Sequence, residues 1–177
     1  MTDEVPADSA EYQSSMGAFY RDMAGQLAEL LRQGRSVGLL AEGDPFFYGS
    51  FMHMWWRLAP DFPVEVVPGV TGMSGCWTRA NLPITWGNDT LAVLPGTLEE
   101  ERLVERLRLS DAAVIMKVGR NLAKVRRAVD AAGLLSRAVY VERGTMQDER
   151  IMPLAACEAA AGAYFAMVLI AGQGRRL

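Results

Sequence analysis

Short apolar runs alternate with helical patterns along this chain, and this alternation limits the fold more than any other feature. Ser36 to Ala41 (SVGLLA) is an apolar run between Gly34 and Gly43, which is the pattern of a buried strand. Val64 to Val67 is a second such run, and a short helix is predicted between the two at Phe51 to Leu58. Strands that alternate with helices are typical of an open sheet with parallel strands. We therefore predict an α/β fold.

The alternation continues on both sides of these elements. From residue 12 to residue 33 the apolar side chains recur at intervals of three and four, which predicts a helix with one apolar face. Gly34 follows this helix, where a C-terminal cap glycine belongs. Helices are also expected at Thr71–Ala80, Thr97–Leu109 and Leu122–Ala132, and strands at Leu91–Leu94, Ala112–Lys117, Ala138–Glu142 and Tyr164–Ile170.

A connection with Pro83 and Gly87, from Leu82 to Asn88, divides the chain into two halves of similar size. We predict an N-terminal α/β domain over residues 1–88 and a C-terminal α/β domain over residues 89–177. A doubly wound domain usually opens with a strand, whereas the first element predicted here is a helix. The parallel sheet of the N-terminal domain is therefore expected to lack its opening strand.

The composition of the 177 residues excludes several classes of protein. Half of the residues are hydrophobic and 22% are charged, which suits a globular core rather than a disordered chain. The net charge of -3 argues against a partner nucleic acid, and no apolar run reaches the roughly 18 residues of a membrane span. Cys76 and Cys157 have no metal-ligand spacing and resemble free thiols of a reducing compartment. The N-terminus lacks a signal-peptide pattern, so we expect a cytoplasmic protein.

The first candidate site is the loop Glu42 to Gly49 (EGDPFFYG). Gly43 allows the backbone to turn sharply or to approach a ligand closely, and Pro45 restrains the residue before it. Asp44 places a carboxylate at the end of a predicted strand. Two interpretations stay open, namely a loop that contacts a ligand and a plain turn in which Asp44 caps the next helix.

The second candidate site is the loop Pro68 to Gly75 (PGVTGMSG), which opens a predicted helix with three glycines and two hydroxyls. Main-chain amides at a helix N-terminus suit polar or anionic groups, although a tight turn for close helix packing explains the same residues. Both loops follow the carboxyl ends of predicted strands. If these strands are parallel, the loops lie on the same edge of the sheet, where α/β proteins bind ligands.

The remaining polar features are less specific. The turn Glu142 to Thr145 (ERGT) follows a strand, and it either lines a cleft or carries a solvated charge pair. His53, the only histidine, lies in a short apolar helix, so we expect it to pack rather than to act as a general base. The chain has no Walker, GxGxxG, HExxH or nucleophile-elbow motif. We therefore predict no metal site and assign no catalytic residue.

Longer strings of sequence resemble the tetrapyrrole methylase family, from about Tyr12 to the C-terminus. They are EGDPFFYGSFMHMWWRL, VEVVPGVTGMSG, LAVLPGTLEEE, AAVIMKVGRNLAKVRRAV, YVERGTMQDERIMPL and YFAMVLIAG. The resemblance implies two α/β domains, the second with a mixed sheet, with S-adenosylmethionine bound between them, and a homodimer. It also implies methyl transfer to a tetrapyrrole substrate. Within the family, MKVGRN and YVERGTM resemble the members that methylate C(20), so the resemblance implies C(20) of precorrin-2, or of its cobalt form, as the acceptor in cobalamin biosynthesis.

The resemblance also implies which residues contact the cofactor. They fall in the two glycine-containing loops and at strand ends of the second half: Glu42, Gly43, Asp44, Phe47, Thr71, Gly72, Met116, Lys117, Gly144, Tyr164, Phe165 and Ala166. The last three are expected to border the adenine. The carboxylates of a tetrapyrrole need Arg or Lys partners, for which Lys117, Arg120 and Arg143 are the candidates.

One departure from the family pattern bears on activity. Members open with a strand and a loop of the form GxGPGDPELLTLKA, and this chain has no such segment. We therefore expect either a fragment of the family fold or an enzyme of impaired activity. Two other functions stay open. One is a methylase of the same fold with a macromolecular acceptor, such as a diphthine synthase or a ribosomal RNA methyltransferase, and the other is a non-catalytic binding module.

Overall fold

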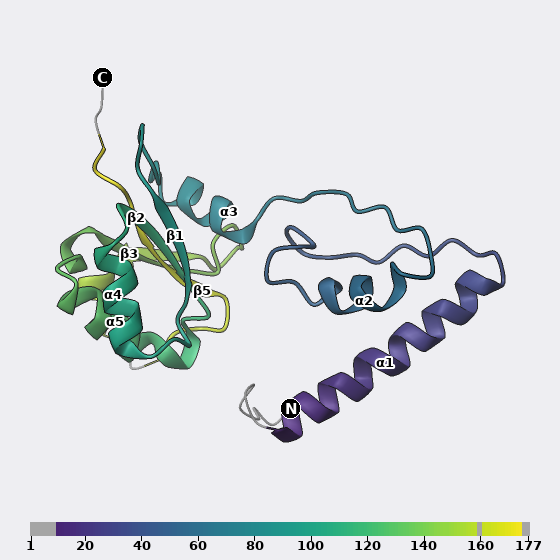
Figure 1. Cartoon of the computed structure of the whole chain (residues 1–177). Coiled ribbons are helices and arrows are strands. Elements are labelled where there is room, and N and C mark those ends of the chain that lie inside the picture. Colours follow the sequence, from purple (N-terminus) through teal and green to yellow (C-terminus); the bar gives the residue numbers. More distant parts are fainter. Residues whose placement is uncertain (1–9, 159–160, 175–177) are drawn as a thin grey trace. The chain divides into compact units, whose positions relative to one another are not determined.

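The computed structural model describes residues 10–158 and 161–174, and the chain divides into two compact units, Met1–Thr71 and Gly72–Leu177 (Figure 1). The division precedes the domain boundary predicted after Asn88, because α3 (Gly72–Arg79) packs with the second unit. The boundary after Asn88 stays a prediction. Within the described ranges, no helix is both long enough and apolar enough to cross a membrane.

Two helices form the framework of the first unit. α1 (Ala10–Arg32) confirms the predicted long helix, and the φ of 79° at Gly34 is that of a C-terminal cap glycine. α2 (Phe51–Leu58) begins and ends at the predicted residues. The two helices pack through a small buried cluster that consists of Ala24, Ala28, Met54 and Leu58. Most of the buried apolar core of the described chain therefore lies in the second unit.

The parallel sheet predicted for the N-terminal half was wrong. In the described part of this unit, residues 36–41 and 64–67 form no strand and run as irregular connections. A strand is stable only when its main-chain N–H and C=O groups pair with a neighbouring strand, and these runs have no such partner there. As a result Leu40 is fully exposed and Val67 is 72% exposed, although both belong to runs with the pattern of a buried strand.

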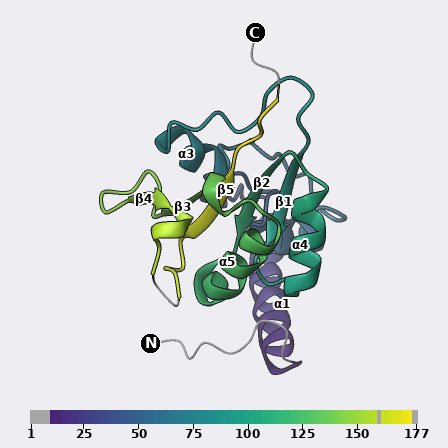
Figure 2. The same cartoon turned by 90° about the vertical axis from the view of Figure 1, so that its left-hand side faces the viewer.

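A five-stranded mixed sheet forms the centre of the second unit, with the strand order β1-β2-β5-β3-β4 (Figure 2). The strands are β1 (Leu91–Pro95), β2 (Ala112–Met116), β3 (Ala138–Glu142), β4 (Arg150–Pro153) and β5 (Ala166–Ile170). β1 and β2 are parallel, β5 is antiparallel to β2 and β3, and β4 is antiparallel to β3. The mixed sheet expected for the C-terminal half is confirmed, and β4 is a strand that the sequence did not predict.

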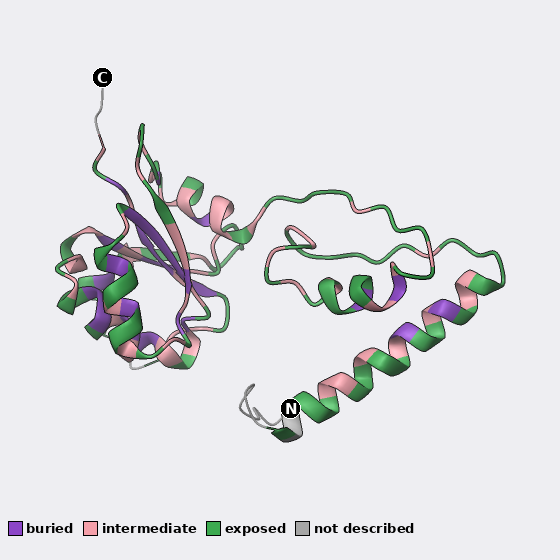
Figure 3. Cartoon of the chain, viewed as in Figure 1, coloured by how far each residue is buried: buried purple, intermediate pink, exposed green. Residues whose placement is uncertain are grey.

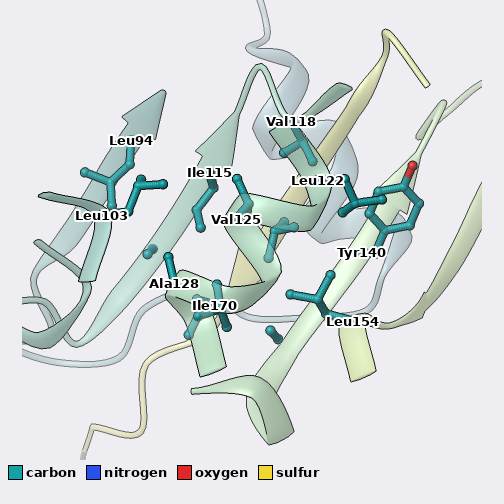
Figure 4. Close-up of a cluster of buried hydrophobic side chains, with 14 of the residues drawn as sticks. Leu94, Leu103, Ile115, Val118, Leu122, Val125, Ala128, Tyr140, Leu154 and Ile170 are labelled. Carbon is teal, nitrogen blue, oxygen red and sulfur yellow. The ribbon is translucent and has the colours of Figure 1, made fainter. Parts of the chain in front are cut away.

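α4 (Glu100–Arg108) and α5 (Leu122–Ala131) pack on one face of this sheet (Figure 3). Leu103 of α4 and Val125 of α5 are wholly buried in the largest hydrophobic cluster, together with Tyr140 of β3 (Figure 4). Three short 3-10 turns complete the unit: η1 (Gly119–Asn121), η2 (Leu135–Arg137) and η3 (Leu154–Ala156).

α3 packs on the opposite face of the sheet. Its buried residue Cys76 belongs to a second cluster with Val114 of β2 and Leu169 of β5. Ala113 and Ile115 of β2 belong instead to the first cluster, so alternate residues of one strand serve opposite faces, as strand geometry requires. The second unit is therefore a sheet covered by helices on both faces.

Replacing Leu103 with alanine is expected to lower the free energy of unfolding by about 2–5 kcal/mol, because its side chain is fully buried and leaves a cavity. Leu109 follows the same helix and is 70% exposed, so Leu109→Ala is the matched control and should change the free energy by less than about 0.5 kcal/mol. Urea denaturation followed by circular dichroism measures both. Equal effects of the two substitutions would contradict the place of Leu103 in the core.

Candidate functional site

The carboxylate of Asp44 joins the two candidate loops of the first unit. Its Oδ1 accepts a hydrogen bond from the main-chain N–H of Phe46 at 2.9 Å, and its Oδ2 accepts one from the N–H of Gly69 at 3.1 Å. Gly43, which has a φ of 76°, makes the turn that precedes this carboxylate. One side chain therefore holds the loop of residues 42–49 against the loop that begins at Pro68.

Gly69 lies so close to Gly43 that no larger residue fits. A Cβ atom on Gly69 would lie 2.8 Å from the carbonyl carbon of Gly43 and 3.2 Å from the Cα of Asp44. The interpretation in which Asp44 caps the next helix is contradicted, because the N-cap of α2 is Ser50 and the two amides that Asp44 binds lie outside α2. The two predicted loops are thus in main-chain contact without a sheet between them.

The other expected site residues of the first unit flank this contact along the chain. Glu42 is exposed, whereas Phe47 and Thr71 are half-buried. The ring of Phe47 packs edge-on against that of Tyr48, with the ring centroids 5.0 Å apart, and Tyr48 has a φ of 53°. Positive φ is uncommon for residues other than glycine and is found preferentially at functional sites.

In the second unit Gly72 begins α3, and the other expected residues meet at one edge of the sheet. β5 runs antiparallel to β2 and β3, so its first residue, Ala166, lies beside the last residue of β3, Glu142. The N–H of Arg143 also donates a hydrogen bond of 2.7 Å to the carbonyl oxygen of Phe165. This register gathers the end of β2, the turn after β3 and the start of β5, which carry Met116, Lys117, Gly144, Tyr164, Phe165 and Ala166.

Three residues in the connections at this edge adopt positive φ although none is a glycine: Lys117 (55°), Arg143 (50°) and Thr145 (72°). Such backbone persists where the surrounding structure enforces it. Lys117, Arg120 and Arg143, the three cations expected to bind substrate carboxylates, are all exposed, and Arg143 forms an ion pair with Asp148 of its own turn.

Gly144 packs against α3, the helix that begins at Gly72. A Cβ atom on Gly144 would lie 2.5 Å from the Sγ of Cys76 and 3.0 Å from the Cγ1 of Val141. Burial above all, and then the Glu149 carboxylate, raise the pKa of the Cys76 thiol to about 11. The thiol therefore stays protonated at neutral pH and serves packing rather than nucleophilic chemistry. Close packing alone explains why residue 144 is a glycine.

Tyr164 and Phe165 present aromatic surface at the same edge. The two residues are 84% and 52% exposed, and their rings pack edge-to-face with the centroids 5.0 Å apart. Ala166, which follows them, is buried at the start of β5. Exposed rings of this kind suit a planar, largely apolar group.

Gly96 belongs to this edge too, and the sequence interpretation missed it. It is buried after β1 and donates a hydrogen bond of 2.6 Å to the carbonyl oxygen of Met116. A Cβ atom there would lie 3.1 Å from the carbonyl oxygens of both Met116 and Lys117. The signal was present, because Pro95-Gly96 follows a predicted strand just as Pro68-Gly69 does.

Comparisons with known proteins place this architecture among characterised relatives. The sequence profile of the Tetrapyrrole (Corrin/Porphyrin) Methylases matches residues 2–159. A precorrin-2 C(20)-methyltransferase from Sinorhizobium sp is 51% identical over 97% of this chain and 70% of its own length. A cobalt-precorrin-2 C(20)-methyltransferase from Salmonella typhimurium is 28% identical over 82% of this chain and 60% of its own length.

Solved structures share the fold. The cobalt precorrin-4 methyltransferase CbiF has a TM-score of 0.70 and 24% identity, over 86% of this chain and 70% of that one. A uroporphyrin-III C-methyltransferase from Thermus thermophilus, complexed with S-adenosylhomocysteine, has a TM-score of 0.63 and 23% identity, over 85% of this chain and 72% of that one. At these identities the likeness supports the fold alone.

Replacing Gly69 with alanine should force the two loops of the first unit apart, because a Cβ atom there overlaps the main chain of Gly43. Hydrogen–deuterium exchange of residues 42–49 is expected to rise by about tenfold, which corresponds to about 1.4 kcal/mol of local stability. Gly38→Ala is the control in the same unit, because a Cβ atom there meets open space. Unchanged exchange in Gly69→Ala would show that this contact does not hold the loops.

The Tyr140 hydroxyl donates a hydrogen bond of 2.8 Å to the Oε2 of Glu142. Burial is the main cause that raises the pKa of Tyr140 from its usual value of 10.0 to about 12, and the Glu142 carboxylate is the second cause. The folded chain therefore binds more protons than the unfolded one between these values, so stability falls as the pH rises through that window. Tyr140→Phe should remove this part of the decline, whereas Tyr164→Phe, at an exposed site, should retain it. Urea denaturation at about pH 9 and about pH 11 tests this, and equal declines in the two variants would refute it.

Proposed function

Because this chain belongs to the tetrapyrrole methylase family, we propose that it transfers a methyl group from S-adenosylmethionine to C(20) of precorrin-2 in cobalamin biosynthesis. The observation that carries this proposal is the 51% identity, over 97% of the chain, to a precorrin-2 C(20)-methyltransferase. Metal-free precorrin-2 is favoured over its cobalt form, because the relative named for the cobalt form is only 28% identical.

The proposed cofactor contacts are the residues that the family resemblance implies. In the first unit they are Glu42, Gly43, Asp44, Phe47 and Thr71, and in the second Gly72, Met116, Lys117, Gly144, Tyr164, Phe165 and Ala166. The charge and the aromatic character of some of these residues suit the ligand. The exposed carboxylate of Glu42 suits a cationic sulfonium or amino group, and the exposed rings of Tyr164 and Phe165 suit an adenine.

The proposed reaction needs alignment more than it needs reactive side chains. When bound, S-adenosylmethionine would supply an activated methyl group, whose carbon would be attacked in line with its bond to sulfur. S-adenosylhomocysteine would then leave, and the proton on the acceptor carbon would be lost to water. Alignment of donor and acceptor contributes about 7–11 kcal/mol in well-oriented reactions. Asp44 serves alignment by holding two loops together. Lys117, Arg120 and Arg143 are the proposed partners of substrate carboxylates, and Arg143 also forms an exposed ion pair with Asp148.

We further propose that the chain acts as a cytoplasmic homodimer. The family resemblance implies the dimer. Cys76 and Cys157 are buried free thiols, as expected in a reducing compartment. Sedimentation velocity distinguishes the dimer from a monomer.

Titration calorimetry with S-adenosylhomocysteine should detect binding to the unaltered chain. Asp44→Asn is expected to weaken this binding by about tenfold or more, because it removes a charged acceptor that joins the two loops. Asp61→Asn is the control, since Asp61 is an exposed carboxyl after α2 in the same unit, and it should leave the affinity within about twofold. Absence of binding heat at ~1 mM S-adenosylhomocysteine would contradict the proposal that this chain forms a cofactor site.

Incubation with precorrin-2 and methyl-labelled S-adenosylmethionine identifies the acceptor. The expected outcome is label in the tetrapyrrole. Label in RNA or protein, with none in tetrapyrrole, would favour a same-fold methylase with a macromolecular acceptor. Binding of S-adenosylhomocysteine without any methyl transfer would favour a binding module.

A further inference from the structure

The turn between β3 and β4 lies in close contact with α3 at two points. A Cβ atom on Gly144 would lie 2.5 Å from the Sγ of Cys76, and one on Gly75 would lie 3.0 Å from the Cγ2 of Thr145. Both contacts depend on the absence of a side chain. They limit how closely the turn and the helix can approach, but neither contact holds the two together.

An ion pair one helical turn further along α3 connects the turn to the helix. Arg79 donates from its Nε to the Oε1 and Oε2 of Glu149, both at 2.9 Å, and its Nη2 donates to the Oε1. The Oε2 of Glu149 also accepts the N–H of Thr145 at 2.9 Å. The Glu149 side chain is only 17% exposed. A single carboxylate therefore closes the turn on itself and ties it to the helix.

The turn depends on such a hold because of its backbone. Arg143 and Thr145 both have positive φ, which residues other than glycine keep only where surrounding contacts enforce it. The guanidinium of Arg79, followed by the Thr145 amide, holds the pKa of the Glu149 carboxyl below its usual range, so the carboxylate is charged at neutral pH. Both partners of the ion pair are therefore charged at neutral pH.

We propose that Arg79 and Glu149 are positioning residues for the cofactor site. They hold the turn that carries Gly144 against the helix that begins at Gly72, and both of these main-chain segments are proposed above to contact S-adenosylmethionine. The inference rests on that proposed function. Arg79 and Glu149 act through the main chain of the turn and the helix, without touching the ligand themselves.

A second ion pair of the same kind provides an internal control. Arg127 of α5 donates from Nε and Nη2 to the carboxylate of Glu100 of α4. The arginine side chains are similarly exposed, at 56% for Arg79 and 62% for Arg127. α4 and α5 cover the face of the sheet opposite α3. The two pairs therefore differ in the segments that they join, and Glu149 differs from Glu100 in that it also accepts the N–H of Thr145.

The test compares Arg79→Met with Arg127→Met in the full chain, because methionine keeps an unbranched apolar stem and removes the guanidinium. Arg79→Met is expected to weaken S-adenosylhomocysteine binding by about 10- to 100-fold, the range found when groups that orient metal ligands are replaced. Arg127→Met should change it by less than about twofold. The KM for S-adenosylmethionine should rise in Arg79→Met while kcat stays near that of the unaltered chain, and both variants should melt at similar temperatures.

Arg79→Lys is a second variant that tests the inference if Arg79→Met folds poorly. Lysine keeps the charge but not the fork of donors, so its affinity for S-adenosylhomocysteine should lie between those of Arg79→Met and the unaltered chain. Equal binding by Arg79→Met and Arg127→Met would overturn the inference alone, as would a kcat that falls with no change in KM. Failure of the unaltered chain to bind S-adenosylhomocysteine would overturn the proposed function, and the inference with it.

Discussion

The position of β5 between β2 and β3 is the constraint on which the second unit depends. Because β5 is hydrogen-bonded antiparallel to both neighbours, its first residues must lie beside the carboxyl ends of β2 and β3. The connections that carry the candidate site residues therefore gather on one edge. The same three strands supply alternate side chains to the clusters on both faces. One set of main-chain hydrogen bonds thus determines both the core and the site edge.

The first unit holds its candidate loops together by other means. No strand ladder supports the described residues of its two apolar runs, and the loops that follow them meet through the carboxylate of Asp44 and the close approach of Gly69 to Gly43. Hydrogen bonds to an ionised acceptor are stronger than those between neutral groups, which suits a contact without a sheet behind it. The geometry of this half therefore depends on a few atoms, whereas the geometry of the other half is spread over a sheet.

This difference explains what the sequence predicted and what it did not. α2 and β3 begin and end at predicted residues because local periodicity reports which side of an element is buried. Periodicity does not report whether a strand has a partner, so residues 36–41 were wrongly predicted as a strand and β4 was missed. Glycines that allow close approach, such as Gly69, were recognisable from their loops. The ion pairs of Arg143 and Arg79 were not recognisable from the sequence. They depend on a turn that has positive φ at residues other than glycine, so the residue types do not indicate its conformation.

Residues 36–41 and 64–67 also affect how the chain behaves among other molecules. An apolar stretch of main chain without a strand partner is a template to which a strand from another molecule can add. Such addition increases with protein concentration and leads towards aggregation, the hazard that chaperones limit by capturing exposed apolar segments. These two stretches are therefore the described part of the first unit most open to strand addition.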